Sequence, residues 1–282
     1  MSRLLALSLV AVLSISSASV IIKLASAPAL ALAFWRLAIS TLIISAMFPK
    51  ALNLRCVSGL NVLYVLVGGS SLGLHFITWI ESLSYVPIAV SVTLVTTHPV
   101  FTALLSYLLL GERLKWRQYV GVLLCVLGVL IMSFSGSLPL HSSLGVVLAL
   151  AGSATASLYF LVGRYLRRSC SLAEYVVPTY LTATFITFAA STLSGVNLVN
   201  YPLTTWLFMI LLALGPMLGG HTVLNYLLRY MKATAVSTLA ACEPIGATLL
   251  GVLLVGEVPD VQMVLGMLIT LLGVYAVLIH EG

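Results

Sequence analysis

Long apolar segments limit the folds open to this chain more than any other feature. Runs such as Val120–Ser133 and Ala233–Val255 continue over the length of a helix, and about 20 mostly apolar residues cross roughly 30 Å of hydrocarbon. Of the 282 residues, 61% are apolar and 7% are charged, whereas a soluble domain has about a quarter charged residues. This composition excludes a water-soluble enzyme, a nucleic-acid-binding protein and a secreted disulfide-rich domain. A membrane barrel would show strands of about ten alternating residues, so the sequence predicts an all-α integral membrane protein.

Charged residues, glycines and prolines divide the chain into ten apolar segments, each a candidate transmembrane helix. The predicted spans are 4–23, 29–48, 58–82, 86–110, 117–135, 142–163, 172–193, 203–229, 233–255 and 261–279. Because the connections are short, we expect no soluble domain at either end or between the spans.

The distribution of basic residues predicts how these spans are oriented. With a cytoplasmic N-terminus, 11 of the 13 Lys and Arg residues lie on the cytoplasmic side, as the positive-inside rule requires. The other two are Lys23, at an outer helix end, and Arg36, inside the second span. The eleven are Arg3, Lys50, Arg55, Arg113, Lys115, Arg117, Arg164, Arg167, Arg168, Arg229 and Lys232. We expect a multi-pass protein of the cell (plasma) membrane with both termini in the cytoplasm, its basic helix ends beside the lipid bilayer.

The four cysteines, Cys56, Cys125, Cys170 and Cys242, show no paired spacing along the chain. Their positions predict neither a disulfide nor a metal site. Nothing else in the sequence calls for a cofactor.

A repeat relates the two halves of the chain. The segment Pro99–Glu112 aligns with Pro244–Glu257 at an offset of 145, with 7 of 14 positions identical. The same offset, or one residue more, pairs Gly121 with Gly266, Gly128 with Gly273 and His75 with His221. Each repeat, 1–138 and 139–282, contains five predicted spans, and because five is odd the second repeat enters the bilayer from the opposite side. Two inverted five-helix repeats are the architecture of many secondary transporters.

The ten-span layout and the duplicated Pro…Gly-Glu…Gly…Gly blocks resemble the drug/metabolite transporter superfamily, specifically its EamA-type members. The stretch Phe34-Trp35-Arg36 is similar to the aromatic-Arg signature of that family. The resemblance covers about residues 4 to 279. It implies a secondary carrier, commonly an exporter of amino acids, other small metabolites or toxic compounds. The first repeat has Thr97-His98-Pro99 where the second has Cys242-Glu243-Pro244, so the polar chemistry of the site is left open.

Ionisable side chains inside the spans are the first candidates for a site, because a charge in hydrocarbon is costly unless it is paired or hydrated. Glu243 lies beside Pro244 near the middle of the ninth span, where it could bind a cationic substrate group or take up a coupling proton. His98 occupies the equivalent place before Pro99, and histidine can change its charge in the physiological range. His98 is therefore a candidate proton partner of Glu243. The alternative for both residues is interhelical hydrogen bonding that only supports packing.

Two histidine pairs add further candidates for substrate binding. Trp79 follows His75 by four residues, and Asn225 follows His221 by four, so the members of each pair share a helix face. We expect these two stripes to line the two ends of one cavity, with His75 toward the outside and His221 toward the inside. Ordinary helix packing is the alternative.

Arg36, Tyr159 and four glycines complete the set of candidates. Arg36 could attract an anionic substrate group, although a structural bond to a carboxylate or a helix C-terminus is the favoured role. Tyr159 could form part of a cavity wall. The glycines repeat seven residues apart, which lets another backbone approach closely, so spans five and ten predict a tightly packed scaffold or a homodimer surface. These glycines are Gly121, Gly128, Gly266 and Gly273.

Three other functional classes differ in how well they fit the sequence. An intramembrane enzyme is disfavoured, since the chain has one Asp, no His-Glu-x-x-His and no Gly-x-Ser-x-Gly segment. An ATP-driven pump is disfavoured because no Walker A segment occurs. A passive facilitator or channel stays open, although no filter-like loop is visible. Histidine, glutamate, asparagine and aromatic side chains together suit a small zwitterion or an aromatic amphiphile, with protons as a candidate coupling ion.

Overall fold

The computed structural model describes residues 2–49, 58–110, 115–133, 142–231 and 233–278, and the regular structure in these ranges is entirely helical. The elements are α1 (Ser2–Ser16), α2 (Ala18–Ala25), α3 (Ala29–Met47), α4 (Leu60–Ser82), α5 (Ile88–Val95), α6 (His98–Leu110), α7 (Trp116–Ser133), α8 (Ser142–Leu166), α9 (Leu172–Leu193), α10 (Leu203–Leu212), the π-helix η2 (Ala213–Thr222), α11 (Val223–Leu227), α12 (Ala233–Ala240), α13 (Glu243–Leu254) and α14 (Val261–Leu278).

Within the described ranges, six helical segments are long and apolar enough to cross a bilayer. They are Leu4–Ala25, Ala29–Met47, Leu60–Ser82, Ser142–Leu166, Leu172–Leu193 and Leu203–Leu227. Shorter apolar helical stretches, the first of them interrupted, occupy the other four predicted spans: Ile88–Thr102, Tyr119–Met132, Glu243–Leu254 and Val261–Ala276. Large apolar side chains such as Leu13, Leu63 and Leu123 are exposed, as expected where lipid replaces water. The all-helical prediction is confirmed for the described residues, whereas the ten-span inverted repeat stays a prediction.

The predicted spans 86–110 and 233–255 are wrong as continuous helices. The first is divided into α5 and α6, and the second into α12 and α13. In each case the break comes just before a proline, Pro99 or Pro244, which cannot donate a backbone hydrogen bond. The chain therefore has two discontinuous helices, α5–α6 and α12–α13.

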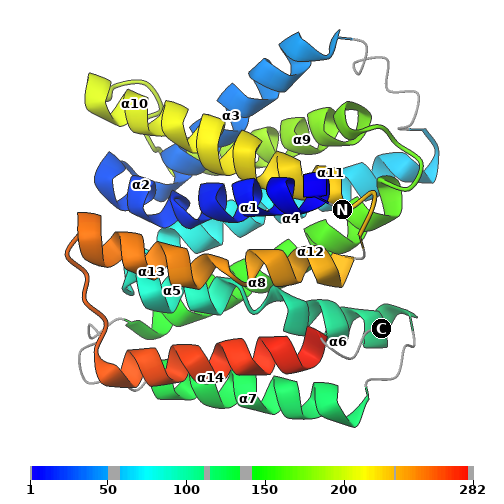
Figure 1. Ribbon diagram of the computed structural model, residues 1–282. Helices are drawn as coiled ribbons and strands as arrows, with labels where there is room; N and C mark the ends of the chain where they lie inside the picture. Colours follow the sequence, from blue (N-terminus) through cyan, green and yellow to red (C-terminus); the bar gives the residue numbers. More distant parts are fainter. Residues whose placement is uncertain (1, 50–57, 111–114, 134–141, 232, 279–282) are drawn as a thin grey trace.

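The helices lie side by side in one bundle (Figure 1). The helices α7 and α14 form a pair along one edge, and α3, α9 and α10 lie along the opposite edge. The first turn of α1 and the last turn of α14 lie at the same end of the bundle. The helices α4, α5, α8, α12 and α13 lie between the two edges and surround the centre.

The glycines of α7 and α14 pack on one another. A Cβ atom on Gly128 would lie 2.6 Å from the carbonyl oxygen of Gly266, and one on Gly273 would lie 2.6 Å from that of Gly121. Gly121 thus lies beside Gly273, and Gly128 beside Gly266, so residue numbers rise along α7 in the direction in which they fall along α14. The two helices therefore run antiparallel. Each glycine face is covered by the other helix of the same chain. Of the two predicted roles, the tightly packed scaffold is therefore confirmed for these faces. A homodimer through another face stays a prediction.

Cys170 corrects one expectation about the cysteines. It is disulfide-bonded, so the prediction of a chain without disulfides is wrong at this position. Spacing along the sequence does not reveal cysteines that folding brings together, because the condition for a disulfide is a Cα separation of about 4.4–6.8 Å in space.

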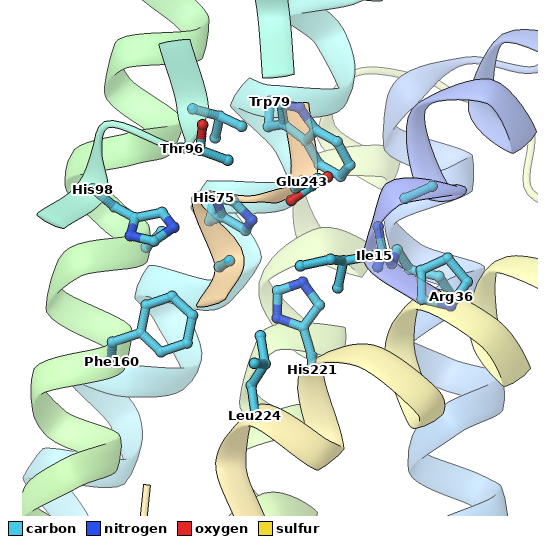
Figure 2. Close-up of a pocket in the computed structure, with 15 residues that line it drawn as sticks. Ile15, Arg36, His75, Trp79, Thr96, His98, Phe160, His221, Leu224 and Glu243 are labelled. Atoms are coloured by element: carbon cyan, nitrogen blue, oxygen red, sulfur yellow. The ribbon is translucent and has the colours of Figure 1, made fainter. Parts of the chain in front are cut away.

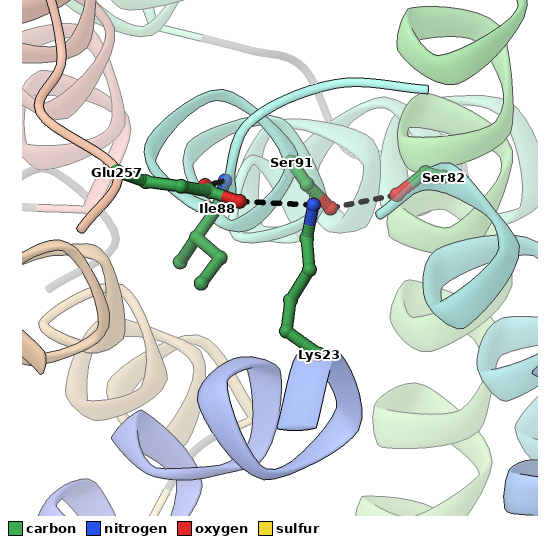
Figure 3. Close-up of polar contacts among 5 residues, drawn as sticks. All are labelled: Lys23, Ser82, Ile88, Ser91 and Glu257. Atoms are coloured by element: carbon green, nitrogen blue, oxygen red, sulfur yellow. Dashed lines mark hydrogen bonds and ion pairs between the residues drawn. The ribbon is translucent and has the colours of Figure 1, made fainter. Parts of the chain in front are cut away.

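An ion pair joins the two halves of the chain at the end of the bundle away from the start of α1. Lys23 Nζ, at the end of α2, lies 2.9 Å from a carboxylate oxygen of Glu257, in the α13–α14 connection. The other oxygen of Glu257 accepts a 2.7 Å hydrogen bond from the N–H of Ile88, the first residue of α5. Nearby, the hydroxyls of Ser82 and Ser91 are 2.6 Å apart (Figure 3). Glu257 thus caps α5 and binds α2 at once.

Replacing Glu257 tests these two contacts separately. Glu257→Gln keeps an acceptor for Ile88 but loses the ion pair, and we expect it to lower stability by about 0.5–1 kcal/mol because the pair is partly exposed. Glu257→Ala also uncaps α5, which adds about 1 kcal/mol. Thermal unfolding in detergent measures both. In combination with Lys23→Met, Glu257→Gln should cause no further loss, and additive losses would contradict the pairing.

Candidate functional site

One cavity brings together six of the eight side chains that the sequence singled out. The six that line it are Arg36, His75, Trp79, His98, His221 and Glu243 (Figure 2). Ile15 and Phe160 are among the apolar residues that complete its wall. The space open to the centres of water molecules is about 30 Å³, and one water needs about 10–15 Å³ of such space. In this conformation the cavity has room for about two waters, so a larger molecule requires the surrounding helices to move.

The two helix breaks bring His98 and Glu243 to this cavity. His98 is the first residue of α6 and Glu243 the first of α13. Because Pro99 and Pro244 lack an N–H, the carbonyls four residues before them, on Val95 and Ala240, receive no helical hydrogen bond from them. Both of those residues also line the cavity. The repeat thus places equivalent residues of the two halves, with equivalent interruptions, around one space.

Serine and threonine side chains hold the first break against α8. The Ser157 hydroxyl donates to the carbonyl of His98 at 2.7 Å, and the hydroxyls of Thr97 and Ser153 are 3.0 Å apart. The His98 ring packs on Phe160 with centroids 5.2 Å apart, and its Nδ1 has no hydrogen-bond partner among the described residues. At the second break, the carbonyl of Glu243 accepts from the Ser16 hydroxyl at 3.5 Å. Both breaks are therefore supported by neighbouring helices.

His75 and His221 lie next to each other, so their predicted places at opposite ends of the cavity are wrong. Their ring centroids are 6.0 Å apart. The depth of a residue along a predicted span does not show which side chains of other helices it contacts in the fold. His75 Nδ1 donates to the carbonyl of Gly152 at 2.9 Å, which makes Nε2 the acceptor in the neutral ring. Trp79 stacks on His75 at 5.9 Å and 9°, as the shared helix face predicts.

Asn225 and Tyr159 lie behind the cavity wall rather than on it. The Asn225 amide nitrogen donates to the Tyr159 hydroxyl and, at 2.9 Å, to the carbonyl of His221. His221 lies in the last turn of the π-helix η2, which ends at Thr222, and Asn225 lies in the α-helix α11 that follows. The side chain of Asn225 therefore buttresses the segment that carries His221. Neither Asn225 nor Tyr159 is among the residues that line the cavity.

Tyr159→Phe tests this supporting role. The variant removes one buried hydrogen bond and leaves the amide of Asn225 with one partner fewer, so we expect a loss of about 1 kcal/mol in stability. Thermal unfolding in detergent measures the loss. Tyr165→Phe, at an exposed position of the same helix, is the matched control and should change little. Equal stability of the two variants would contradict the role of Tyr159 as a support.

Arg36 is fully buried, yet it forms neither of the structural bonds that the sequence favoured. None of its three guanidinium nitrogens has a hydrogen-bond partner among the described residues. The guanidinium carbon lies 3.9 Å from the centre of the Phe76 ring and 5.9 Å from that of Trp79. These aromatic faces attract a cation. Arg36 thus presents a stacked, unpaired guanidinium to the cavity.

Sequence reasoning missed the residues that carry and position the ionisable groups. Phe76 supports Arg36, and Ser153 and Ser157 hold the break before His98. A signal existed for the serines, because they lie four residues apart on one face of a helix otherwise dominated by apolar and small residues. Phe76 had no such signal, since phenylalanine is common throughout apolar spans.

Comparison with known proteins agrees with this architecture. The model of the EamA-like transporter family matches residues 3–134 and again residues 143–279. An uncharacterized transporter of Bacillus subtilis, YdfC, is 26% identical over 182 residues, which are 64% of this chain and 59% of that protein. An uncharacterized transporter of Archaeoglobus fulgidus is 23% identical over 198 residues, which are 68% of each chain. The match thus spans about three fifths of the Bacillus protein and two thirds of the archaeal one.

A crystal structure of another protein has a similar fold. Its TM-score to this chain is 0.70, and the superposition covers 98% of this chain and 96% of that chain. At 18% sequence identity, the likeness concerns the fold alone. The family match over both parts of the sequence and the apolar helical bundle agree: this protein belongs to the EamA-like transporter family and is a multi-pass membrane protein.

Proposed function

We propose that this protein is a secondary active carrier that exports small metabolites, such as amino acids or amphiphilic drug-like compounds, by alternating access. The observation that carries the proposal is the central cavity, in which equivalent residues of the two halves meet. A site between two inverted halves can be exposed to one side of the membrane and then to the other when the halves rock.

Contacts between counterparts support a two-fold axis through this cavity. A two-fold axis that exchanges residues 1–138 with 139–282 passes through the midpoint between each residue and its counterpart. Two counterparts that are in contact must therefore lie next to the axis. Cys125 and Thr270 are such a pair at an offset of 145, with Sγ 3.5 Å from the carbonyl oxygen. His75 and His221 are another, at an offset of 146 and a ring separation of 6.0 Å. The inferred axis runs from the α7–α14 pair into the cavity.

The helix breaks offer hinges for the rocking motion. Each break interrupts the backbone hydrogen bonds of a helix next to the cavity, and such interruptions occur at the midplane sites of transporters. Movement of α6 against α5, or of α13 against α12, would widen the cavity from its present room for about two waters. Opening of the end that holds Lys23 and Glu257 would require this ion pair to separate.

Glu243 and His98 are the proposed proton-coupling groups. Both line the cavity, both begin a helix after a break, and both can exchange a proton when the site is exposed to water. The excess of Lys and Arg on one side supports the placement of both termini in the cytoplasm and of the protein in the plasma membrane.

Counterflow in proteoliposomes tests the proposal. Vesicles loaded in turn with amino acids, aromatic amines, nucleosides and sugar phosphates are mixed with the labelled compound, with and without a pH gradient. A carrier exchanges one class saturably, and proton coupling makes net flux follow the pH gradient. A passive facilitator or channel would only dissipate gradients, without stimulation of uptake by internal compound.

A further inference from the structure

Four arginines gather where α8 and α11 end, at a place separate from the central cavity, which none of them lines. Arg164 Nη1 donates to the carbonyl of Leu228 at 2.6 Å, and Arg167 Nε donates to the carbonyl of Asn225 at 3.1 Å. Both carbonyls lie at the end of the helical segment Leu203–Leu227, where the helix dipole attracts cations. The ends of α8 and α11 are thus joined through guanidinium groups.

Arg168 and Arg229 complete this arginine cluster, and both are exposed. Arg168 interacts electrostatically with Arg164, while burial and the charge of Arg229 together lower the pKa of Arg167. Among the described residues, none of the four forms an ion pair with a carboxylate. A helix C-terminus supplies about half a negative charge, so the protein leaves most of the positive charge of the cluster unbalanced.

The carboxylate that follows the arginine cluster in the sequence, that of Glu174, is held in a helix cap. It accepts a hydrogen bond from the N–H of Ser171 at 2.9 Å, and the Ser171 hydroxyl accepts one from the N–H of Glu174 at 3.3 Å. This capping box begins α9. A countercharge for the cluster is therefore expected from a bound anion.

Tyrosine rings place the arginine cluster at the surface of the bilayer. Tyr165 and Tyr230, each next to an arginine in the sequence, are both 53% exposed. Tyr165 packs on Tyr64 with ring centroids 4.7 Å apart, and Tyr230 packs on Tyr226 at 5.1 Å. Tyrosine is enriched at the membrane–water interface, and the helices that end here are long enough to cross the hydrocarbon. The exposed arginines thus lie at the depth of the lipid phosphates.

We propose that the arginine cluster is a binding site for the headgroup of an anionic phospholipid. The phosphodiester of such a lipid offers two oxygens to the forked guanidinium group, and basic pockets between transmembrane helices suit anionic headgroups. Arg168 and Arg229 contact the phosphate, and Arg164 keeps its bond to Leu228 while it adds a third positive charge. The bound lipid holds the ends of α8 and α11 together. This site is separate from the proposed carrier function and does not rest on it.

Thermal unfolding of the purified, delipidated protein in detergent tests the site. The probes are dioleoylphosphatidylglycerol, which is anionic, dioleoylphosphatidylcholine, which has no net charge, and inorganic phosphate. A ligand that binds only the folded state raises the melting temperature. We expect phosphatidylglycerol to raise it at concentrations at which phosphatidylcholine and inorganic phosphate have no effect, and native mass spectrometry to show phosphatidylglycerol retained on the protein.

Substitutions distinguish a site from the general charge of the surface. Each basic residue near an anionic lipid contributes about fivefold to affinity, so the double variant Arg168→Gln with Arg229→Gln should bind phosphatidylglycerol about 25-fold more weakly. Arg168→Lys with Arg229→Lys keeps the charges without the forks and should lose less. Arg117→Gln removes an exposed charge at the start of α7 and should bind like the wild type. Equal melting temperatures without lipid show that the variants are folded.

Several outcomes would overturn the inference. Full affinity for phosphatidylglycerol in the folded double glutamine variant would remove the arginines from lipid binding. Equal weakening by Arg117→Gln would mean that the lipid responds to the charge of the whole surface. Equal stabilisation by phosphatidylcholine would assign the effect to acyl chains, and stabilisation by inorganic phosphate to the same extent would make the cluster a site for a free anion.

Discussion

Replacing Gly128 with leucine is expected to prevent α7 and α14 from packing and to abolish recovery of folded protein. The Cβ atom alone would lie 2.6 Å from the carbonyl oxygen of Gly266 and from the backbone nitrogen of Thr270. These are backbone atoms, which cannot rotate away as a side chain would. In a bilayer, close packing is what holds helices together, because lipid solvates apolar surfaces as well as a neighbouring helix does.

A graded series makes this expectation measurable. Gly128→Ala should cost about 2–3 kcal/mol, the upper part of the usual range for overpacking, and Gly273→Ala should behave alike because its contacts are the reciprocal ones. Gly215→Ala is the matched control, since a Cβ at Gly215 meets nothing within 4 Å. Thermal unfolding and size-exclusion profiles in detergent report the result. If the variants elute from the size-exclusion column as smaller particles but keep their thermal stability, the glycine faces form a dimer contact instead.

Composition and the pattern of apolar residues were enough to predict the fold class and most of the helices. The scarcity of charge fixes a helical membrane protein, and charges with prolines place most helix ends within a few residues. The interruptions of α5–α6 and α12–α13 were missed because hydropathy is averaged over a whole span, and His98 and Glu243 hardly change that average. Proline signalled both positions, but the sequence does not distinguish a kink from a full break.

The site residues were predicted where equivalent positions of the two repeats could be compared. Comparison of the halves singled out His98, Glu243, His75 and His221, all of which line the cavity. The four-residue helix spacing that singled out Asn225 did not place it on the cavity wall, because its side chain donates to Tyr159 and to the carbonyl of His221 instead. The contact between His75 and His221 was also not predicted, because position along a span does not show which side chains of different helices meet in three dimensions.

Neutralising Glu243 has the largest effect that we expect on transport. Glu243→Gln should reduce exchange in counterflow about 100-fold or more, because the variant removes the only carboxylate among the residues that line the cavity, and a lost charge pair in a buried site costs about 2–5 kcal/mol. Glu243→Asp keeps the charge one methylene shorter and should restore part of the flux. Glu174→Gln is the control, since Glu174 belongs to the capping box of α9, where glutamine also serves.

The pH dependence of the remaining flux then assigns the proton. If Glu243 carries it, a pH gradient should drive net flux in the wild type and have no effect on the residual flux of Glu243→Gln. If His98 carries it instead, Glu243→Gln should stay gradient-driven at its lower rate, and His98→Gln should lose the response. Loss of the response in both single variants would mean that the two groups act as a pair across the cavity. Full wild-type exchange in Glu243→Gln would remove Glu243 from the site, because no other carboxylate lines the described cavity.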